Sequence, residues 1–369
     1  MKAYQYRLYP TGKQEKAMLA VLDACRFLWN HCLAQRKTAY EKDKKTISCF
    51  TQIKAIPVLA VSNPFLREIY SQTAQDVPRR LDKAFRAFFR RVKAGEKPGY
   101  PRFKGKGWYN SFTYPQANGS FGIDDDGKLY LSKIGHVKIA YHRPVQGVLK
   151  TCVVKRSSTG KWYVVLTCDE VVEPKLSPSS EQVGIDMGLE TFSTLSNGEK
   201  RANPRFFKRE QDALAKVQRK FSKQAKGTPE RKRARKVVSK VHERIANKRE
   251  NFVHQESRKL VNRYGLLAFE DLNVRKMMEK YGKSIGDAAW SSFLGKLSYK
   301  AESAGRTVLR VNPAYTSQTC SQCGNRQKID EKVRVYQCPI CGLVLHRDLN
   351  ASINILRAGL CSLATQKVA

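Results

Sequence analysis

The stretch GIDMG at residues 184–188 closes an apolar run that begins at Val183. A short apolar run bounded by glycine predicts a buried β-strand, so Asp186 lies at the end of a strand. AFEDL at 268–272 likewise puts Glu270 at the end of an apolar run, and HRDLNAS at 346–352 puts Asp348 at the start of a predicted helix. Three acids at the edges of three elements are typical of a metal-dependent nuclease, which gathers distant carboxylates around its ions.

Strand and helix patterns alternate around these stretches. The further elements predicted are a strand at 191–195, a helix at 290–304 ended by Gly305, and a strand at 307–311. This order is typical of a ribonuclease-H or RuvC-like α/β fold, with expected limits of 183–314 and 345–360. In open sheets, reactive groups collect at the carboxyl ends of neighbouring strands, so we expect Asp186 and Glu270 to lie together.

The three acids predict a magnesium site. Taken singly, an aspartate at a strand end is as often a cap or a turn former, and Glu270 alone could be a surface acid. Taken together, Asp186, Glu270 and Asp348 can bridge two divalent ions about 4 Å apart, which activate a water and stabilise the leaving 3′ oxygen of a phosphodiester. Magnesium suits all-oxygen ligands, and manganese is a possible substitute.

Three neighbours of Asp348 have open roles. Asn350 is interpreted either as a hydrogen-bonding partner of the metal ligands or as a residue of the helix start. His346 and Arg347 could meet a phosphate, or could equally be surface residues. Arg347 is retained as a candidate nucleic-acid contact.

Four of the ten cysteines form two Cys-x-x-Cys pairs, Cys320 with Cys323 and Cys338 with Cys341, separated by fourteen residues. Each pair is followed by a glycine, which permits the turn that aims two thiolates at one ion. Four thiolates in this spacing predict a closed, tetrahedral, structural zinc site, and the expected zinc ribbon covers 315–344. The alternative is two pairs of unligated thiols. The scattered remaining cysteines fit a reducing, cytoplasmic location.

The composition predicts a polyanionic partner. The 369 residues include 69 Lys and Arg against 32 Asp and Glu, a net charge of +37 that a compact monomer would not need for solubility. A membrane is the rival partner, but the sequence offers no run of ~18 apolar residues and no signal peptide, so none is expected.

The N-terminal half predicts a small antiparallel β-barrel with a helical bundle inserted. Residues 1–10 and 98–170 carry short strand patterns and hairpin turns, whereas 11–97 carries apolar residues at helical spacing. The expected core stripe of its second helical block is Leu81, Phe85, Phe88 and Val92. A linker is expected at 171–182 and a flexible tail at 361–369. The fold class is therefore a multidomain α+β protein.

Two basic segments are candidates for nucleic-acid contact. Residues 200–250 hold nineteen Lys or Arg against five Asp or Glu, on helices with apolar stripes at Leu214, Val217 and Phe221 and at Val237, Val241 and Ile245. Charged helices are usually only solvated faces, but this surplus exceeds what solubility needs. Cations and aromatics interleave in the loop 100–109, which could also be a simple flexible linker. Its candidate contacts are Arg102, Phe103, Lys104 and Lys106.

The order of these motifs resembles the TnpB proteins of bacterial insertion sequences, relatives of type V CRISPR effectors. The resemblance covers KAYQYRLYPT at the N-terminus, LDKAFRAFFRRVKAGEKPGYPRFKGK in the middle, and all the C-terminal motifs. It implies a wedge barrel interrupted by a helical recognition lobe, followed by the RuvC-like domain. It also implies a transposon-derived guide RNA and a double-stranded DNA target next to a short flanking motif. In such proteins the neighbourhood of Gln72 and Gln75 recognises that motif.

The expected function is therefore an RNA-guided DNA endonuclease. Nuclease chemistry and polyanion binding follow from the residues, whereas guidance by RNA is implied by the resemblance. The alternatives are an RNA-guided DNA-binding protein that does not cut, which the presence of all three acids disfavours, and a transposition accessory protein or transposase. No His-hydrophobe-His motif with a tyrosine nucleophile supports strand transfer.

Overall fold

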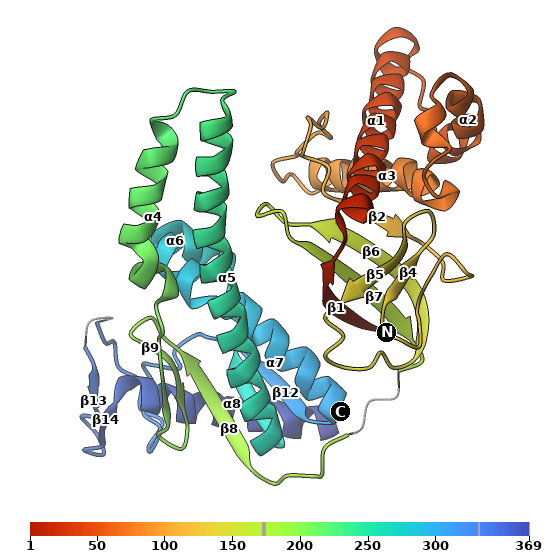
Figure 1. Cartoon of the computed structure of the whole chain (residues 1–369). Helices are drawn as coiled ribbons and strands as arrows, with labels where there is room; N and C mark the ends of the chain where they lie inside the picture. The colour runs from red at the N-terminus through yellow and green to blue at the C-terminus, as the bar shows by residue number, and fades with distance from the viewer. Residues whose placement is uncertain (172–174, 331–332, 369) are drawn as a thin grey trace. The chain divides into compact units, whose positions relative to one another are not determined.

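The computed structural model describes residues 1–171, 175–330 and 333–368. The chain divides into two compact units, Met1–Val172 and Glu173–Ala369, and each is described by itself (Figure 1). Of the linker expected at 171–182, residues 172–174 lie outside the described residues, as do 331 and 332 of the expected ribbon and 369 of the expected tail.

The first unit is built on one antiparallel sheet of seven strands in the order β2-β6-β7-β1-β5-β4-β3. Its strands are β1 Lys2–Tyr9, β2 Ser111–Tyr114, β3 Phe121–Ile123, β4 Leu129–Leu131, β5 Gly135–Ile139, β6 Val148–Arg156 and β7 Trp162–Asp169. The N-terminal strand pairs with β5 and β7, as predicted, and β3 is a strand that the sequence analysis missed. The edges approach each other through side chains: the Tyr114 and Phe121 rings lie 6.2 Å apart, and Tyr114 Oη donates to Ser132 O at 2.8 Å. The sheet therefore curls.

Three α-helices are inserted between β1 and β2: α1 Gly12–Asp43, α2 Cys49–Ser62 and α3 Ser71–Lys93, with a short 3-10 turn at Pro64–Leu66. Helix α1 starts at Thr11 in a reciprocal capping box with Gln14. The predicted stripe on α3 is wrong at its end: Leu81 is fully buried, but Val92 is 49% exposed. The reason is that the core reaches only the N-terminal half of α3, and Phe88 packs instead against the Tyr100 ring at 5.4 Å.

The second unit is built on a five-stranded sheet in the order β10-β9-β8-β11-β12. Its strands are β8 Gln182–Met187, β9 Thr191–Leu195, β10 Lys200–Ala202, β11 Leu266–Glu270 and β12 Thr307–Val311. Strand β11 runs parallel to β8 and β12, whereas β9 is antiparallel to β8 and β10. The strands predicted around Asp186 and Glu270 are confirmed, and β10 was missed.

Helices cover both faces of this sheet: α4 Phe206–Ser222, α5 Pro229–Arg263, α6 Val274–Ala288, α7 Trp290–Ala304 and α8 Arg347–Val368. Leu267 and Phe269 join one core with α5 and α7, and Ala268 between them joins another with Ile355 of α8. Helix α8 lies close to β8 because position 184 is glycine: a Cβ built there would overlap the carbonyl oxygen of Ser352. The sheet is therefore the middle of three layers.

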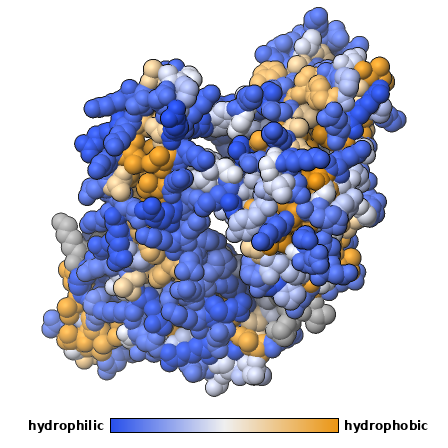
Figure 2. Space-filling view, viewed as in Figure 1, coloured by the Kyte–Doolittle hydropathy of each residue, from blue (hydrophilic) through white to orange (hydrophobic). Residues whose placement is uncertain are grey.

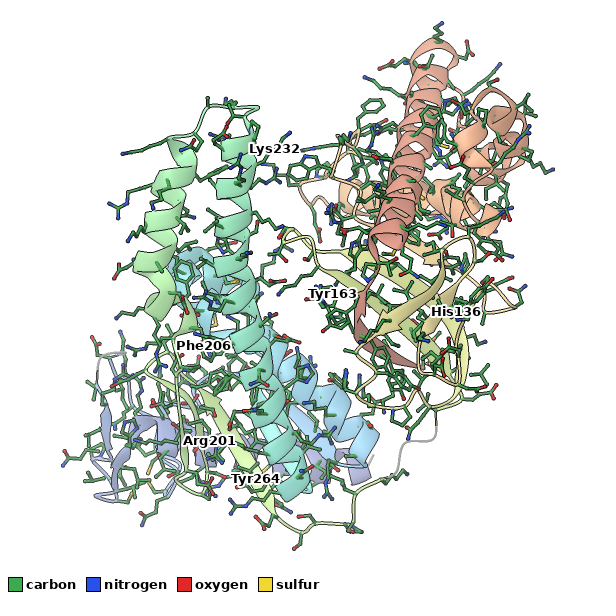
Figure 3. All side chains as sticks on the ribbon, in the orientation of Figure 1. His136, Tyr163, Arg201, Phe206, Lys232 and Tyr264 are labelled. Carbon is green, nitrogen blue, oxygen red and sulfur yellow. The ribbon has the colours of Figure 1, made fainter. Side chains whose placement is uncertain are left out.

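Helices α4 and α5 form a long hairpin with its own small core of Leu214, Val241 and Ile245. Phe206 at its base packs edge-on against Phe252, with ring centroids 6.0 Å apart, and Lys232 lies near its tip (Figure 3). The predicted stripe is wrong at Val237, which is 45% exposed, because Val238 faces the core of the hairpin in its place. Hydrophilic residues dominate the visible face of this hairpin (Figure 2).

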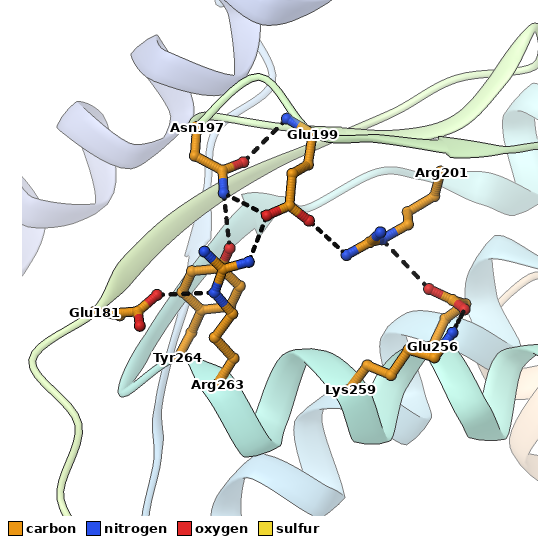
Figure 4. A network of polar contacts seen from close by, with 8 residues as sticks. All are labelled: Glu181, Asn197, Glu199, Arg201, Glu256, Lys259, Arg263 and Tyr264. Carbon is orange, nitrogen blue, oxygen red and sulfur yellow. Dashed lines mark hydrogen bonds and ion pairs between the residues drawn. The ribbon is translucent and has the colours of Figure 1, made fainter.

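A polar network fixes the end of α5 to the edge of the sheet (Figure 4). Arg263 pairs with Glu181 before β8 and with Glu199 between β9 and β10, and Asn197 Nδ2 donates to Tyr264 Oη at 3.0 Å. Arg201 pairs with Glu199 and with the buried Glu256 of α5. The acidic and basic side chains that join the α4–α5 hairpin to the sheet thus balance one another in charge.

One correction concerns the C-terminal region. The expected flexible tail from residue 361 is instead a continuation of α8 to Val368, because no proline or helix-ending glycine follows Gly359. Within the expected ribbon, β13 Val335–Gln337 pairs antiparallel with β14 Val344–His346.

Across the described residues, no helix combines the length and apolarity that a membrane crossing requires.

Candidate active site

Asp186 and Glu270 are brought together by strand register. Ile185 of β8 lies opposite Phe269 of β11 in the parallel ladder, so the next residue on each strand is an acid at the same level. Residues two apart on a strand share a face, so Asp186 shares the face of Gly184 and Glu270 that of Ala268. Gly184 and Ala268 both contact α8. Both carboxylates therefore lie on the side of the sheet that α8 covers.

Asp348 comes to this place as the second residue of α8, and it is 8% exposed. Burial, then the charges of Glu270 and Asp348, raise the pKa of Asp186 well above its ordinary value, while Arg347 opposes the rise. Burial also raises the pKa of Glu270, and a hydrogen bond from Thr316 opposes it. A cluster of three carboxyls, of which Asp186 and Glu270 resist ionisation, is the arrangement that a divalent cation relieves.

The chemistry of this donor set fits magnesium, because all the ligand atoms are carboxylate oxygens. Among the residues that the structure describes, the one group placed to share a single ion is instead the four cysteines. The acids need not be as compact, since two ions about 4 Å apart can each take a different subset of oxygens. Arg347 Nη2 lies 3.4 Å from Asp348 Oδ1, and His346 Nδ1 lies 3.9 Å from Asp348 Oδ2. Two basic side chains, Arg347 and His346, therefore lie next to Asp348.

The four cysteines form a second site, with all four sulfurs within 4.8 Å of one another. Cys320 Sγ lies 3.6 Å from Cys341 Sγ, and Cys323 Sγ lies 3.6 Å from Cys338 Sγ. Tetrahedral zinc with bonds of about 2.3 Å separates its sulfurs by about 3.8 Å, so the spacing suits zinc. A disulfide at about 2.05 Å does not fit this spacing.

The two cysteine pairs have the same backbone geometry. Gly324 N donates to Cys320 O at 3.0 Å, and Gly342 N donates to Cys338 O at 3.1 Å. Both glycines have positive φ, 79° and 72°, which explains why glycine follows each pair. The backbone N–H of Cys341 holds the pKa of the Cys338 thiol down at about 6. The thiolate form of Cys338 is thereby favoured, and a thiolate is the form that binds a metal.

Asn350 lies at the start of α8, as one of its two interpretations had it. Its side chain is fully buried and brackets Cys320: Oδ1 accepts from Ser321 N at 2.9 Å, and Nδ2 donates to Thr319 O at 2.8 Å. The amide therefore supports the backbone of a cysteine ligand rather than a carboxylate. The other interpretation placed it beside the metal-binding acids because Asp348 is two residues away, but residues i and i+2 of a helix point in different directions.

The nucleic-acid candidates of the first unit lie on one loop and one helix. Arg102, Phe103 and Lys106 are exposed, and Lys104 is partly buried. The loop is held by α1: Trp29 Nε1 donates to Arg102 O at 3.0 Å, and Asn30 exchanges two hydrogen bonds with the backbone of Lys104. Loop 100–109 is therefore anchored to α1, which excludes the alternative that it is a simple flexible linker.

Gln72 and Gln75 both lie in the first turn of α3 and are half-buried. Gln72 Nε2 donates to Gln116 Oε1 at 3.2 Å, so part of its hydrogen-bonding capacity is used within the protein. Its Oε1 is buried without a partner in the structure. Both glutamines remain predictions as DNA contacts.

Several residues that matter to these sites were missed from the sequence. Thr316 donates to Glu270 Oε1 at 2.5 Å, Asn354 and Arg357 bind the backbone beside Cys320, and Trp108 is 61% exposed in the basic loop. The sequence holds one indication of the missed residues of α8. Asn350, Asn354 and Arg357 recur at helical spacing and form a polar stripe on a helix that is otherwise apolar there. Nothing local marks Thr316.

Three family models match the chain. They are described as a helix-turn-helix domain over residues 1–45, a "Probable transposase" over 163–280, and the TNB domain of Cas12f1-like proteins over 290–355. Residues 1–45 here form strand β1 and the single long helix α1, so the first description does not fit their structure.

Two relatives match almost from end to end. A "Putative RNA-guided DNA endonuclease" of Streptomyces pristinaespiralis is 34% identical over 376 residues, which cover 98% of this chain and 90% of that protein. A "Putative RNA-guided DNA endonuclease InsQ" of Escherichia coli K12 is 30% identical over 388 residues, covering 99% and 94%. Both relatives are named as RNA-guided DNA endonucleases, and this is the class of protein to which the chain is related. The chain belongs to the TnpB family.

A solved structure shares the fold. The chain matches a protein in the cryo-EM structure of a Cas12f1-sgRNA-target DNA complex with a TM-score of 0.58 and 16% identity. The match covers 94% of this chain and 83% of that one.

Proposed function

We propose that this chain is an RNA-guided DNA endonuclease that hydrolyses phosphodiesters at Asp186, Glu270 and Asp348. The observation that carries the proposal is the meeting of these three acids at the strand ends of β8 and β11 and the start of α8. Guidance by RNA is supported by the end-to-end relatives, which are named for that activity, and by the net charge of +37. The seven-stranded sheet then corresponds to a wedge barrel, and the five-stranded sheet to a RuvC-like domain with an inserted zinc ribbon.

Each residue has a defined task in this proposal. Asp186, Glu270 and Asp348 are the residues that would hold the magnesium or manganese ions, and the charges of both other acids act on Asp186. Bound ions supply an activated water and stabilise the leaving 3′ oxygen. Arg347, next to Asp348, offsets the negative charge of the acids and can contact a phosphate. The four cysteines hold a structural zinc ion.

The partners proposed are a transposon-derived guide RNA and a double-stranded DNA that carries a short flanking motif. Base pairing with the RNA supplies the sequence specificity, and the protein reads only the motif. Gln72 and Gln75 are the proposed readers of that motif. The basic loop with Arg102, Phe103, Lys104 and Lys106 is the proposed RNA contact.

The first test is cleavage of one plasmid with matched, scrambled and absent RNA. We expect cutting only with the matched RNA, and Asp186→Ala, Glu270→Ala or Asp348→Ala should each abolish cutting while target binding survives. Because the three acids act as a unit, double variants should be no worse than single ones. Equal cutting with all three RNAs would rule out guidance, and full activity in Asp186→Ala would rule out the site.

Asp271→Ala is the matched control for these variants. Asp271 directly follows Glu270, but its side chain is 70% exposed and lies 3.7 Å from Arg310. It should cut like the unmodified protein, because this solvated acid lies outside the cluster of Asp186, Glu270 and Asp348.

A further inference from the structure

One carboxylate oxygen of Glu270 is held by a buried threonine. Thr316 Oγ1 lies 2.5 Å from Glu270 Oε1, and each residue is 9% exposed. The hydroxyl has one proton and a second acceptor within reach, Pro313 O at 3.2 Å. An ionised carboxylate is the stronger acceptor, so the proton points to Glu270 whenever Glu270 acts as a metal ligand. Oε1 is thereby fixed, and Oε2 is left for an ion.

Helix α8 fixes the backbone from which Thr316 projects. Asn354 Nδ2 donates to Thr316 O at 2.9 Å and to Thr319 O at 2.7 Å. One turn earlier, Asn350 holds Thr319 O and Ser321 N, and one turn later Arg357 Nη2 donates to Ser321 O at 2.7 Å. The segment 316–321 is therefore clamped along its length by three side chains of one helix.

The same segment contains a zinc ligand. Cys320 lies between Thr319 and Ser321, the two residues that Asn350 binds. The start of α8 supplies Asp348, and its next turns support both Thr316 and Cys320. The four-cysteine site and the carboxylate site thus share one rigid connection, in which a displacement of Cys320 is passed to the Glu270 carboxylate.

We propose that Thr316 is a positioning residue that orients Glu270 for metal binding, and that the clamped segment 316–321 makes this orientation depend on the four-cysteine site. The inference rests on the proposed function, since it assigns Glu270 a metal. It adds a residue outside the three acids and a role for the cysteines beyond holding their own region together.

The test is Mn²⁺ binding to the full-length protein, measured as the loss of the electron paramagnetic resonance signal of free Mn²⁺. Thr316→Val removes the hydroxyl but keeps the volume, and partners of this kind contribute about 10- to 100-fold to metal affinity. We expect binding to weaken by that factor in Thr316→Val and to return in Thr316→Ser. Cleavage by Thr316→Val should need correspondingly more Mn²⁺ yet approach the unmodified rate at saturation, which a general folding defect would not produce.

Thr365→Val is the matched control. It makes the same substitution at an exposed residue of α8 outside segment 316–321, where the Thr365 hydroxyl donates to Cys361 O at 3.0 Å. It should bind Mn²⁺ like the unmodified protein. If Thr316→Val folds poorly, Thr316→Ala provides the same loss of the hydroxyl without a second methyl group beside the carboxylate.

The outcomes separate the inference from the proposed function. If the unmodified protein binds Mn²⁺, Asp186→Ala does not, and folded Thr316→Val and Thr316→Ala both bind normally, the role of Thr316 is wrong and the nuclease site stands. If the unmodified protein and Asp186→Ala bind Mn²⁺ alike, the proposed site itself fails. Removing zinc with a thiol-reactive reagent should weaken Mn²⁺ binding as well, and undiminished binding would overturn the link to the cysteines.

Discussion

Asp186 sits in a place that favours its protonated form, and this has a measurable effect on stability. Burial and the charges of Glu270 and Asp348 raise its pKa in the folded protein. The unfolded chain loses the proton near pH 3.9, whereas the folded chain keeps it to a higher pH. From about pH 4 upward, therefore, the folded state binds more protons than the unfolded state, and rising pH destabilises the metal-free protein.

We therefore predict that Asp186→Asn stabilises the magnesium-free protein, and more so at pH 8 than at pH 5. An amide cannot ionise, so the variant loses this pH dependence. Thermal denaturation in magnesium-free buffer with zinc retained measures the difference, where each kcal/mol shifts Tm by about 2 to 4 °C.

Asp271→Asn provides the comparison, since its side chain is 70% exposed. Its effect on Tm should be the same at both pH values. Added Mg²⁺ should stabilise the unmodified protein more than Asp186→Asn, and an Asp186→Asn effect independent of pH and Mg²⁺ would contradict the assignment.

The places of the acids and of the cysteine pairs in the fold were predictable from the sequence because each has a local signature. An apolar strand ending in an acid and a Cys-x-x-Cys pair are both visible within a few residues. Thr316, by contrast, acquires its role from Glu270, 46 positions away. The hydrogen-bonding interpretation of Asn350 pointed to the wrong partner for a related reason, because its neighbour in sequence is Asp348 while its neighbour in space is Cys320.

At the scale of the elements, the packing of α8 on β8 depends on a position without a side chain. A Cβ at Gly184 would overlap Ser352 O and come 2.9 Å from the Leu356 Cβ, so the helix would have to move away from the sheet. Because α8 supplies Asp348 and the clamp on segment 316–321, its displacement affects both sites. Backbone at such a distance cannot yield as a flexible side chain can.

We predict that Gly184→Ala destabilises the second unit by about 3 kcal/mol or more, with loss of cleavage. Chemical denaturation followed by circular dichroism measures it. Gly295→Ala is the matched control: it lies in α7, where a Cβ meets nothing within 4 Å, and should leave stability unchanged or raise it by about 0.5 to 1 kcal/mol. Equal effects of the two variants would mean that α8 does not pack this closely.

The elements themselves were largely predictable, and their ends less so. Strand β11 is an uninterrupted apolar run, and α7 ends at Gly305 as its sequence indicates. The short strands β3 and β10 have three residues each and acquire strand geometry only from their hairpin neighbours. The exposed Val92 shows the same limit, since periodicity identifies a face of a helix but not how far a partner covers it. Val237 lies beside the packed face of α5, which holds Val238 instead.

At the scale of the whole molecule, the net charge of +37 predicts strong salt dependence of RNA binding. With about 6 to 10 phosphate contacts, affinity should fall by about three to five decades between 50 and 200 mM salt. Lys232, Lys236 and Lys240 are exposed on one face of α5, so changing all three to glutamine should lower the slope of log affinity against log salt by about 2 to 3. Filter binding over a salt series measures both.

Lys128→Gln is the control, because Lys128 Nζ lies 2.9 Å from Asp126 and its charge is already balanced. For Lys128→Gln, the slope of log affinity against log salt should match that of the unmodified protein. An unchanged slope in the triple variant would show that the α4–α5 hairpin is a solvated face and that the RNA is bound elsewhere.

The position of the ribbon between β12 and α8 has a consequence for the living cell. During synthesis, the chain presents the acids of β8 and β11 first, then the cysteines, and only afterwards the aspartate of α8. A nascent chain therefore lacks one of the three acids of the proposed site until the ribbon has been made and the helix has docked. The order of translation thus delays the appearance of a DNA-cutting activity until the rest of the enzyme is in place.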